Sequence, residues 1–204
     1  GWMQELRPTY EQGMITAFIR VEGKSLGVVA NNPAVLAGAI DAGCADKAAR
    51  FMRLCEQFKL PVLFLCDTPG RMVGPEAEKE GTVRAAGDMF KAAAALTVPF
   101  GSITLRKGYG LGALAMMGGH SRITRFTISW PTGEFGPMGL EGAVRLGFRK
   151  ELEAIEDAAE RDALFKKMVE GLYQKGKALN VASYNEIDAV IDPAESRTWI
   201  KQLL

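Results

Sequence analysis

Two glycine-bearing turns are the parts of this sequence best suited to chemistry. The first, DTPG at residues 67–70, follows the apolar run 62–66, and the second, KGYGLGA at residues 107–113, follows the run 102–105. Glycine lets a ligand approach the main chain closely, and a helix that begins near Gly112 presents unpaired N–H groups in its first turn. Two such turns facing one point would form an oxyanion hole, in which main-chain donors stabilise negative charge on an oxygen.

The composition of each turn limits what it can bind. Pro69 has no N–H group, so the donor in the first turn is Gly70 or Arg71. The second turn lacks the G-x-x-x-x-G-K-[ST] pattern of a phosphate-binding loop. It fits the dinucleotide pattern only loosely, because alanine stands at position 113 instead of the third glycine. The alternative is that both turns are ordinary tight connections between strands and helices.

Reactive side chains are few, and we expect structural roles for most of them. His120 has no cysteine or serine partner in a catalytic motif, so it is expected to be a loop histidine. Cys44, Cys55 and Cys66 are spaced by eleven residues, which is not metal-ligand spacing. They are expected in a loop, a helix and a strand, as buried structural thiols. The sequence therefore predicts no metal site.

The charged residues around the two turns each have two interpretations. Asp67 ends a buried strand, where it either caps the following turn or orients the loop. The cationic residues Arg71, Arg106 and Lys107 border the predicted pocket, where they either steer anionic groups or solvate the loops. The remaining candidates are an acidic patch, expected to be solvated, and a methionine pair, expected in the core: Glu76, Glu78, Glu80, Met116 and Met117.

The composition excludes several classes of protein. The 204 residues, of which 48% are hydrophobic, suffice to bury the core of a globular domain. A formal net charge of +1 argues against nucleic acid as the main partner. No apolar run reaches the roughly 18–20 residues of a membrane span. Three cysteines make no disulfide framework and no signal peptide is visible, so a reducing, cytoplasmic location is expected.

Alternating short elements must position the turns. Apolar runs bounded by turn signals predict strands at 14–22, 25–31, 62–66, 99–105, 123–130 and 187–191, the first two forming a hairpin. Helical spacing predicts helices at 45–59, 82–97, 112–118, 137–147, 150–179 and 193–204, with a glycine-rich loop at 106–111. The alternation of strands and helices is typical of an α/β domain with right-handed crossovers.

Several motifs, in this order, resemble the C-terminal half of a biotin-dependent carboxyltransferase of the acyl-CoA carboxylase β-subunit family. They are GVVANNP (27–33), ADKAARF (45–51), CDTPG (66–70), RKGYGLGA (106–113), WPTGE (130–134), MGLEGAV (138–144) and IDAVIDPA (187–194). The resemblance implies a crotonase-like spiral of ββα units with a C-terminal helical extension that packs on a neighbouring subunit. It also implies that residues 1–204 form a single carboxyltransferase domain.

The resemblance implies carboxyl transfer from carboxybiotin to the α-carbon of an acyl-CoA. This chain would supply the biotin-facing half of a site that lies between subunits. The N–H groups of Gly112 and Ala113, with Gly70 or Arg71 opposite, would hold the ureido oxygen of biotin. No side-chain base is needed if the released biotin nitrogen takes the α-proton. The residues expected to bind substrate or biotin are Leu114, Ala115, Arg106 and Tyr109.

The sequence departs from the family pattern in three ways, which define its expected partners. The acyl-CoA-binding N-terminal half is absent, so that half is an expected partner. No MKM biotinylation motif occurs, so biotin is expected on a separate carrier protein or domain. The loop YGLGA is one residue longer than the form expected of propionyl-CoA-type members, which leaves the acyl group open. A trimer or hexamer of this chain is expected.

Three other functions stay open at this point. The first is half of a biotin-dependent decarboxylase, which runs the same transfer in reverse. The sequence does not distinguish this function from that of a carboxylase. Alternatively, it is a standalone crotonase-like hydrolase or isomerase, for which Glu134 would be the acid near the oxyanion turns. The last is a non-catalytic assembly module whose helical tail mediates oligomerisation.

Overall fold

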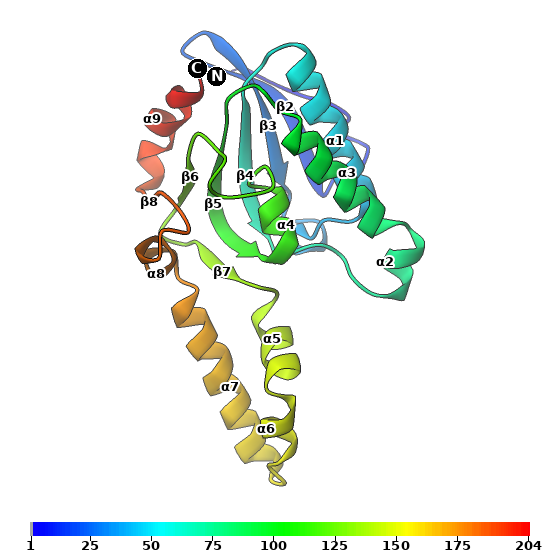
Figure 1. Cartoon of the computed structure of the whole chain (residues 1–204), viewed down its shortest axis with the longest axis vertical. Helices are drawn as coiled ribbons and strands as arrows, with labels where there is room; N and C mark the ends of the chain where they lie inside the picture. Colours follow the sequence, from blue (N-terminus) through cyan, green and yellow to red (C-terminus); the bar gives the residue numbers. More distant parts are fainter. Residues whose placement is uncertain (1) are drawn as a thin grey trace.

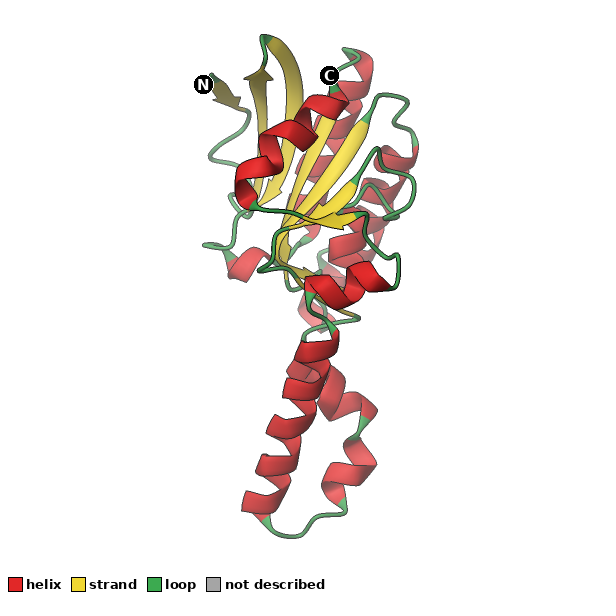
Figure 2. Cartoon of the chain, turned by 90° about the vertical axis from the view of Figure 1, so that its left-hand side faces the viewer, coloured by secondary structure: helices red, strands yellow, loops and turns green. Residues whose placement is uncertain are grey.

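The computed structural model describes residues 2–204 and shows a mixed eight-stranded sheet with helices on both faces (Figures 1 and 2). An antiparallel meander comprises β1 (Met3–Glu5), β2 (Met14–Val21) and β3 (Lys24–Asn31). The following strands pair in parallel in the order β3, β4, β5, β6, β8, while β7 pairs with the end of β5. Their bounds are β4 (Val62–Thr68), β5 (Phe100–Tyr109), β6 (Thr127–Ser129), β7 (Glu134–Gly136) and β8 (Ala189–Val190).

Helices α1 (Ala42–Gln57) and α3 (Thr82–Ala94) cover one face of the sheet, and α9 (Ser196–Ile200) covers the other (Figure 1). Two apolar clusters result. One joins α1 and α3 to β4 through residues such as Phe51 and Phe64, and the other joins Phe126 to Trp199. The strand β4 is buried on both faces of the sheet, which accounts for its continuous run of apolar residues.

The carboxyl ends of β4 and β5 lie side by side, because the two strands are parallel neighbours. The chain leaves β4 through a turn, passes through α2 (Pro75–Lys79) and enters α3. It leaves β5 directly into α4 (Gly110–Ala115). In open parallel sheets, ligands bind in the crevice outside the carboxyl ends of the strands. Both glycine-bearing turns therefore lie where such a fold places its ligands.

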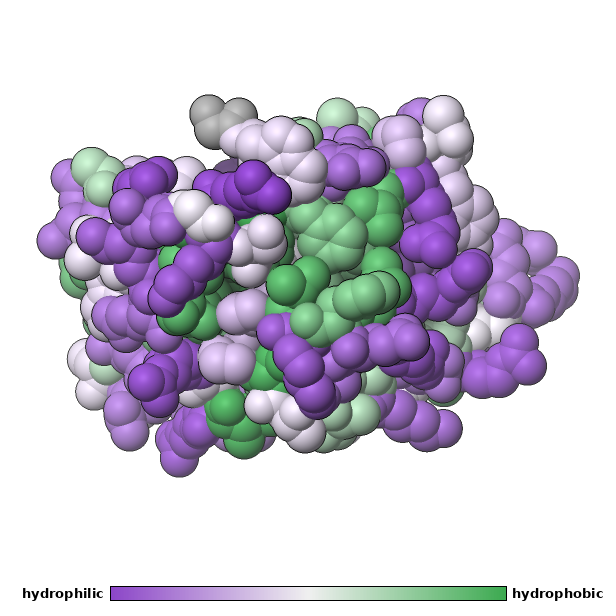
Figure 3. All heavy atoms as spheres, turned by 90° about the horizontal axis from the view of Figure 1, so that it is seen from above, coloured by the Kyte–Doolittle hydropathy of each residue, from purple (hydrophilic) through white to green (hydrophobic). Residues whose placement is uncertain are grey.

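An arm of three helices extends from the body beyond β7 (Figures 1 and 2). It comprises α5 (Leu140–Gly147), α6 (Arg149–Glu153) and α7 (Ala158–Lys175), and α8 (Ala178–Ser183) returns the chain to the sheet. Within the described chain, α7 has no buried residue. At the end away from the arm, where the termini lie, an apolar patch is framed by hydrophilic side chains (Figure 3). No helix of residues 2–204 combines the length and apolarity of a membrane span.

The predicted α/β alternation and the hairpin of β2 and β3 are confirmed. The predicted loop at 106–111 is wrong, because β5 continues to Tyr109, where it pairs with β7, and α4 begins at Gly110. The predicted strand 123–130 shrinks to Thr127–Ser129, and α3 ends at Ala94. The strands β1 and β7 were not predicted, because each is only three residues long.

The predicted helix 150–179 is broken twice. Asp157 caps a new helix, since its Oδ1 accepts a hydrogen bond of 2.8 Å from the Glu160 N–H. Gly176 ends that helix because its main chain pairs with β7: the Phe135 N–H donates to its carbonyl at 2.8 Å. A Cβ at position 176 would collide with the Phe135 carbonyl. The predicted helix 193–204 is two 3₁₀ turns around the short α9.

Candidate functional site

The two glycine-bearing turns face each other at one point. A Cβ on Gly112 would lie 2.6 Å from the carbonyl carbon of Gly70 and 3.0 Å from the N atom of Arg71. Both atoms belong to the main chain, so only glycine permits this approach. The structure thus brings Gly112 of the second turn against Gly70 and Arg71 of the first, which the sequence placed in two separate turns.

The first turn takes a form that leaves one N–H group free. Gly70 has a φ of 122°, a region that favours glycine. Its N–H donates to Thr68 Oγ1 at 3.1 Å, and that hydroxyl donates to the Gly70 carbonyl at 3.0 Å. The Arg71 N–H makes no hydrogen bond within the described residues. Of the two donors that the sequence allowed, Arg71 is therefore the one available to a ligand.

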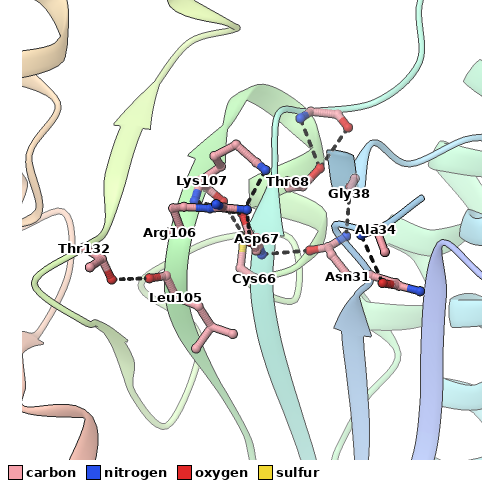
Figure 4. A network of polar contacts seen from close by, with 12 residues as sticks. Asn31, Ala34, Gly38, Cys66, Asp67, Thr68, Leu105, Arg106, Lys107 and Thr132 are labelled. Atoms are coloured by element: carbon pink, nitrogen blue, oxygen red, sulfur yellow. Dashed lines mark hydrogen bonds and ion pairs between the residues drawn. The ribbon is translucent and has the colours of Figure 1, made fainter. Parts of the chain in front are cut away.

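A buried scaffold holds this turn from behind (Figure 4). Asn31 Oδ1 accepts from the Asp67 N–H at 3.1 Å, and Asn31 Nδ2 donates to the Gly38 carbonyl at 3.4 Å. Ile40 pairs with the far side of the turn, because its N–H donates to the Gly70 carbonyl at 3.0 Å and its carbonyl accepts from the Met72 N–H at 2.8 Å. These bonds fix the direction of the Gly70–Arg71 peptide.

The second turn presents the amino end of α4. Gly110 has a φ of 59°, and a Cβ there would lie 2.9 Å from the Pro137 carbonyl oxygen, so glycine is required. The helix begins at Gly110, so the N–H groups of Gly110, Leu111 and Gly112 lie in its first turn, ahead of the first intrahelical bond. The Ala113 N–H is the first that can donate to a carbonyl within the helix, so Gly112 is the predicted donor of this turn that precedes the helical bonds.

Asp67 ties the ends of β4 and β5 together (Figure 4). The carboxylate lies 3.0 Å from Arg106 Nη2 and 3.2 Å from Lys107 Nζ, and it also accepts from the Lys107 N–H at 3.2 Å. Asp67 is 7% exposed, whereas the Arg106 side chain is 54% exposed, so solvent weakens that pair. Asp67 thus joins the strand ends through Arg106 and Lys107, and within the described residues its carboxylate makes no hydrogen bond to residues 68–71, so the prediction that it caps the following turn is wrong.

Two cavities flank α4. The larger one, of about 570 Å³, lies between α4, β7, α7 and α8, and Ala113 and Leu114 are among its lining residues. The smaller one, of about 200 Å³, lies between α3 and α4 and is here called the amide-side cavity. It is lined by Arg71, Val83, Ala86, Gly87, Met89, Phe90, Leu111, Gly112 and Ala115. Leu114 and Ala115, which were expected to bind substrate or biotin, thus face different cavities.

Tyr109 and Arg106, which were expected to bind substrate or biotin, line neither of these two cavities. Tyr109 is buried, and burial together with the neighbouring Glu134 carboxylate raises the pKa of its hydroxyl. Glu134 itself belongs to β7 and also lines neither cavity. These three side chains belong to the contact between β5 and β7 and to the Asp67 network.

The other candidate residues lie outside the two turns, in loops, helices and the core. His120 lies in an exposed loop, as predicted, and its Nδ1 accepts from the Arg122 N–H at 3.0 Å. All three cysteines are buried, as predicted, but Cys44 lies in the first turn of α1 and not in a loop. Burial raises the pKa of the Cys44 thiol to about 12. The acidic residues of α2 and its carboxyl end are exposed, and the methionine pair is buried: Glu76, Glu78, Glu80, Met116 and Met117.

Sequence reasoning missed two contributors to the site. Thr68 belongs to the turn signal DTPG, but the sequence did not indicate that its hydroxyl selects the free N–H group. Gly87 lines the amide-side cavity from α3, and no turn signal surrounds it. A threonine two residues before a glycine was a weak local signal for the first. The second depends on how α3 packs against α4, which local sequence does not reveal.

A mixed α/β sheet, two main-chain turns that face each other and an arm of three helices between β7 and α8 define the class of protein. The family model "Carboxyl transferase domain" matches residues 1–203. The chain belongs to this carboxyl transferase family, and the crotonase-like fold that the resemblance implied is confirmed.

Individual relatives make the comparison more specific. The chain is 38% identical over 204 residues to the methylmalonyl-CoA carboxyltransferase 12S subunit of Propionibacterium freudenreichii subsp. shermanii, with 98% of this chain and 38% of that protein covered. It is 36% identical over 200 residues to the methylmalonyl-CoA decarboxylase subunit alpha of Propionigenium modestum, with 98% and 38% covered.

Solved structures agree with these relatives. A single-chain, multi-domain long-chain acyl-CoA carboxylase superposes with a TM-score of 0.90 at 56% identity, over 100% of this chain and 20% of that one. The transcarboxylase 12S hexamer, with methylmalonyl-CoA bound, gives a TM-score of 0.90 at 36% identity, over 100% and 39%. The chain spans well under half the length of these relatives.

Proposed function

We propose that this chain supplies the biotin-facing half of a site that transfers a carboxyl group from carboxybiotin to the α-carbon of an acyl-CoA. The observation that carries the proposal is the close approach of Gly112 to the Gly70–Arg71 peptide, whose Arg71 N–H makes no hydrogen bond within the described residues. Such preorganised donors bind an oxygen that gains negative charge as a bond breaks. The ureido oxygen of biotin is such an oxygen.

The reaction balances without a side-chain base. The N–CO2 bond of carboxybiotin breaks, and its electron pair passes to the ureido nitrogen and oxygen. That nitrogen takes the α-proton of the acyl-CoA, and the resulting carbanion bonds to CO2. In this scheme the chain holds the ureido oxygen with its amides, and the loss of one such donor typically costs about 10²–10³ in kcat.

The residues around the amides fit a small ring with an anionic substituent. The amide-side cavity has an apolar wall from α3 and opens beside the two N–H groups. Arg71 is one of its lining residues, and the Arg71 side chain makes no ion pair among the described residues. A guanidinium is a suitable partner for the carboxylate of carboxybiotin.

The proposed partners follow from the fraction of the relatives that this chain represents. We propose that the acyl-CoA binds mainly to an N-terminal half, and that a separate carrier protein or domain brings the biotin. The 12S relative is a hexamer, which supports an oligomer of this chain with sites between subunits. The identity of 36% to a decarboxylase subunit favours the reverse transfer as a second candidate function.

The test is a transfer assay with a ¹⁴C-carboxylated biotin carrier, an acyl-CoA and the N-terminal half. Appearance of label in the acyl-CoA supports carboxyl transfer, and its absence with every acyl-CoA tried contradicts it. Arg71→Pro removes the main-chain donor, whereas Arg71→Ala keeps it and removes only the side chain. We expect the proline variant to lose kcat and the alanine variant mainly to raise KM for the carrier. Equal kcat values for the two variants would contradict the assignment of the donor.

A further inference from the structure

Each helix that borders the amide-side cavity contributes two small residues to its lining. On α3 four of the five lining residues are spaced as i, i+3, i+4 and i+7, namely Val83, Ala86, Gly87 and Phe90, and the buried Met89 is the fifth. Such spacing forms one face of a helix. On α4 the facing residues include Gly112 and Ala115. The centre of the α3 wall therefore consists of alanine and glycine between two larger apolar residues.

Neither conformation nor packing requires glycine at position 87. Its φ is not positive, so the main chain accepts an L side chain. A Cβ at this position would meet no atom within 4 Å. By contrast, a Cβ at Gly112 would collide with the main chain of the first turn. Gly87 lies well inside α3, where glycine stabilises a helix less than alanine does. Because this glycine, which has no structural need, also lines a cavity, it points to a role for the empty space there.

We propose that Gly87 is a specificity-determining residue that keeps the amide-side cavity open for the bicyclic ring of carboxybiotin. This inference rests on the proposed function, and it adds the residue that sets the size of the ring site. The cavity of about 200 Å³ is smaller than the roughly 300–1,000 Å³ of pockets that enclose a whole ligand, so it receives one part of a larger molecule.

The geometry gives each part of that ligand its place. The ureido oxygen lies at the Arg71 and Gly112 amides, which border the cavity. The ring packs against the apolar face of α3. Val83, at 59% exposure, marks the rim, where the tether to the carrier leaves. A side chain at position 87 would occupy the volume of the ring but would leave both amides in place.

The test compares Gly87→Ala and Gly87→Leu with Gly171→Ala, all in the assembled enzyme that contains this chain. Gly171 lies inside α7, a Cβ there meets nothing within 4 Å, and it lines neither cavity. Both alanine variants are expected to raise Tm by about 2–4 °C through helix propensity. Only the Gly87 variants should raise KM for the biotin carrier, by tenfold or more for leucine, with KM for acyl-CoA unchanged.

The outcomes separate this inference from the proposed function. If the wild-type enzyme transfers no carboxyl group from biotin, the proposed function is wrong. If it does, and Gly87→Leu leaves KM for the carrier unchanged, the role of Gly87 is wrong. A rise in KM for acyl-CoA instead would show that the cavity holds the acyl chain and would overturn the biotin assignment. Should the leucine variant not fold, the direction of KM in Gly87→Ala decides.

Discussion

Gly112→Ala tests whether the two turns act as one hole. The added methyl group would lie 2.6 Å from the Gly70 carbonyl carbon, 2.8 Å from its Cα and 3.0 Å from the Arg71 N atom. Ordinary contacts begin near 3.4 Å, so the Gly70–Arg71 peptide or the start of α4 must move by about 0.4–0.8 Å. A misplacement of about 1 Å costs up to roughly 10²-fold in rate. We therefore expect kcat to fall by about 10–100-fold.

The free energy of unfolding should fall by no more than a few kcal/mol, which leaves the protein folded. Overpacking costs about 1–3 kcal/mol, and the better helix propensity of alanine returns up to about 1 kcal/mol. Chemical denaturation measures this difference, and the carboxyl-transfer assay measures kcat and KM. The matched control is Gly142→Ala in α5, whose Cβ would make an ordinary contact of 3.7 Å with Met138. A Gly112→Ala enzyme with a wild-type kcat would refute the joint action of the two turns.

Three further predictions follow from the same contacts. Thr68→Val leaves the Gly70 N–H unpaired, so the free energy of unfolding should fall by about 1–3 kcal/mol, and kcat should fall as well. Thr68→Ser keeps the hydroxyl and should restore both quantities. Failure of that rescue would contradict the role of the hydroxyl. Burial, together with the neighbouring Asp67, raises the pKa of Cys66 to about 12 from 9.0, so the folded protein binds more protons than the unfolded one in this interval. The contribution of Cys66 to the free energy of unfolding is full below about pH 9 and is lost as the pH rises to about 12. Iodoacetamide should label Cys66 only on unfolding, as followed by mass spectrometry. Glu134→Gln should retain carboxyl transfer within about twofold, because that carboxylate borders neither cavity; loss of activity would favour the hydrolase or isomerase.

Local sequence patterns predicted the elements whose signals are strong. The apolar run of β4 and the amphipathic spacing of α1 were found, because burial on both faces or on one face leaves a direct pattern. Residues 106–109 were assigned to a loop because their glycine and charges resemble a turn. They are a strand because β7, some 25 residues later, pairs with them. Pairing between distant segments leaves no local signal.

The candidate site was predictable to the same depth. The two turns were identified because Pro69 and the glycines restrict the main chain, and their meeting follows from parallel neighbouring strands. The choice of Arg71 over Gly70 required the position of the Thr68 hydroxyl. The assignment of Leu114 and Ala115 to different cavities required the rotation of α4 about its axis. Both depend on atomic placement that residue types alone do not determine.

Both proposed donors belong to the main chain, so such a site responds to pH differently from one built on side chains. An amide proton does not dissociate in the range in which proteins stay folded, so acidity leaves the strength of the Arg71 and Gly112 donors unchanged. An enzyme built on a histidine or a carboxylate has a working range set by that side chain. Here the dependence of kcat on pH would report groups that titrate on the ligands or on another chain. Evolution can therefore change the charged residues around the turns without changing the proposed donors.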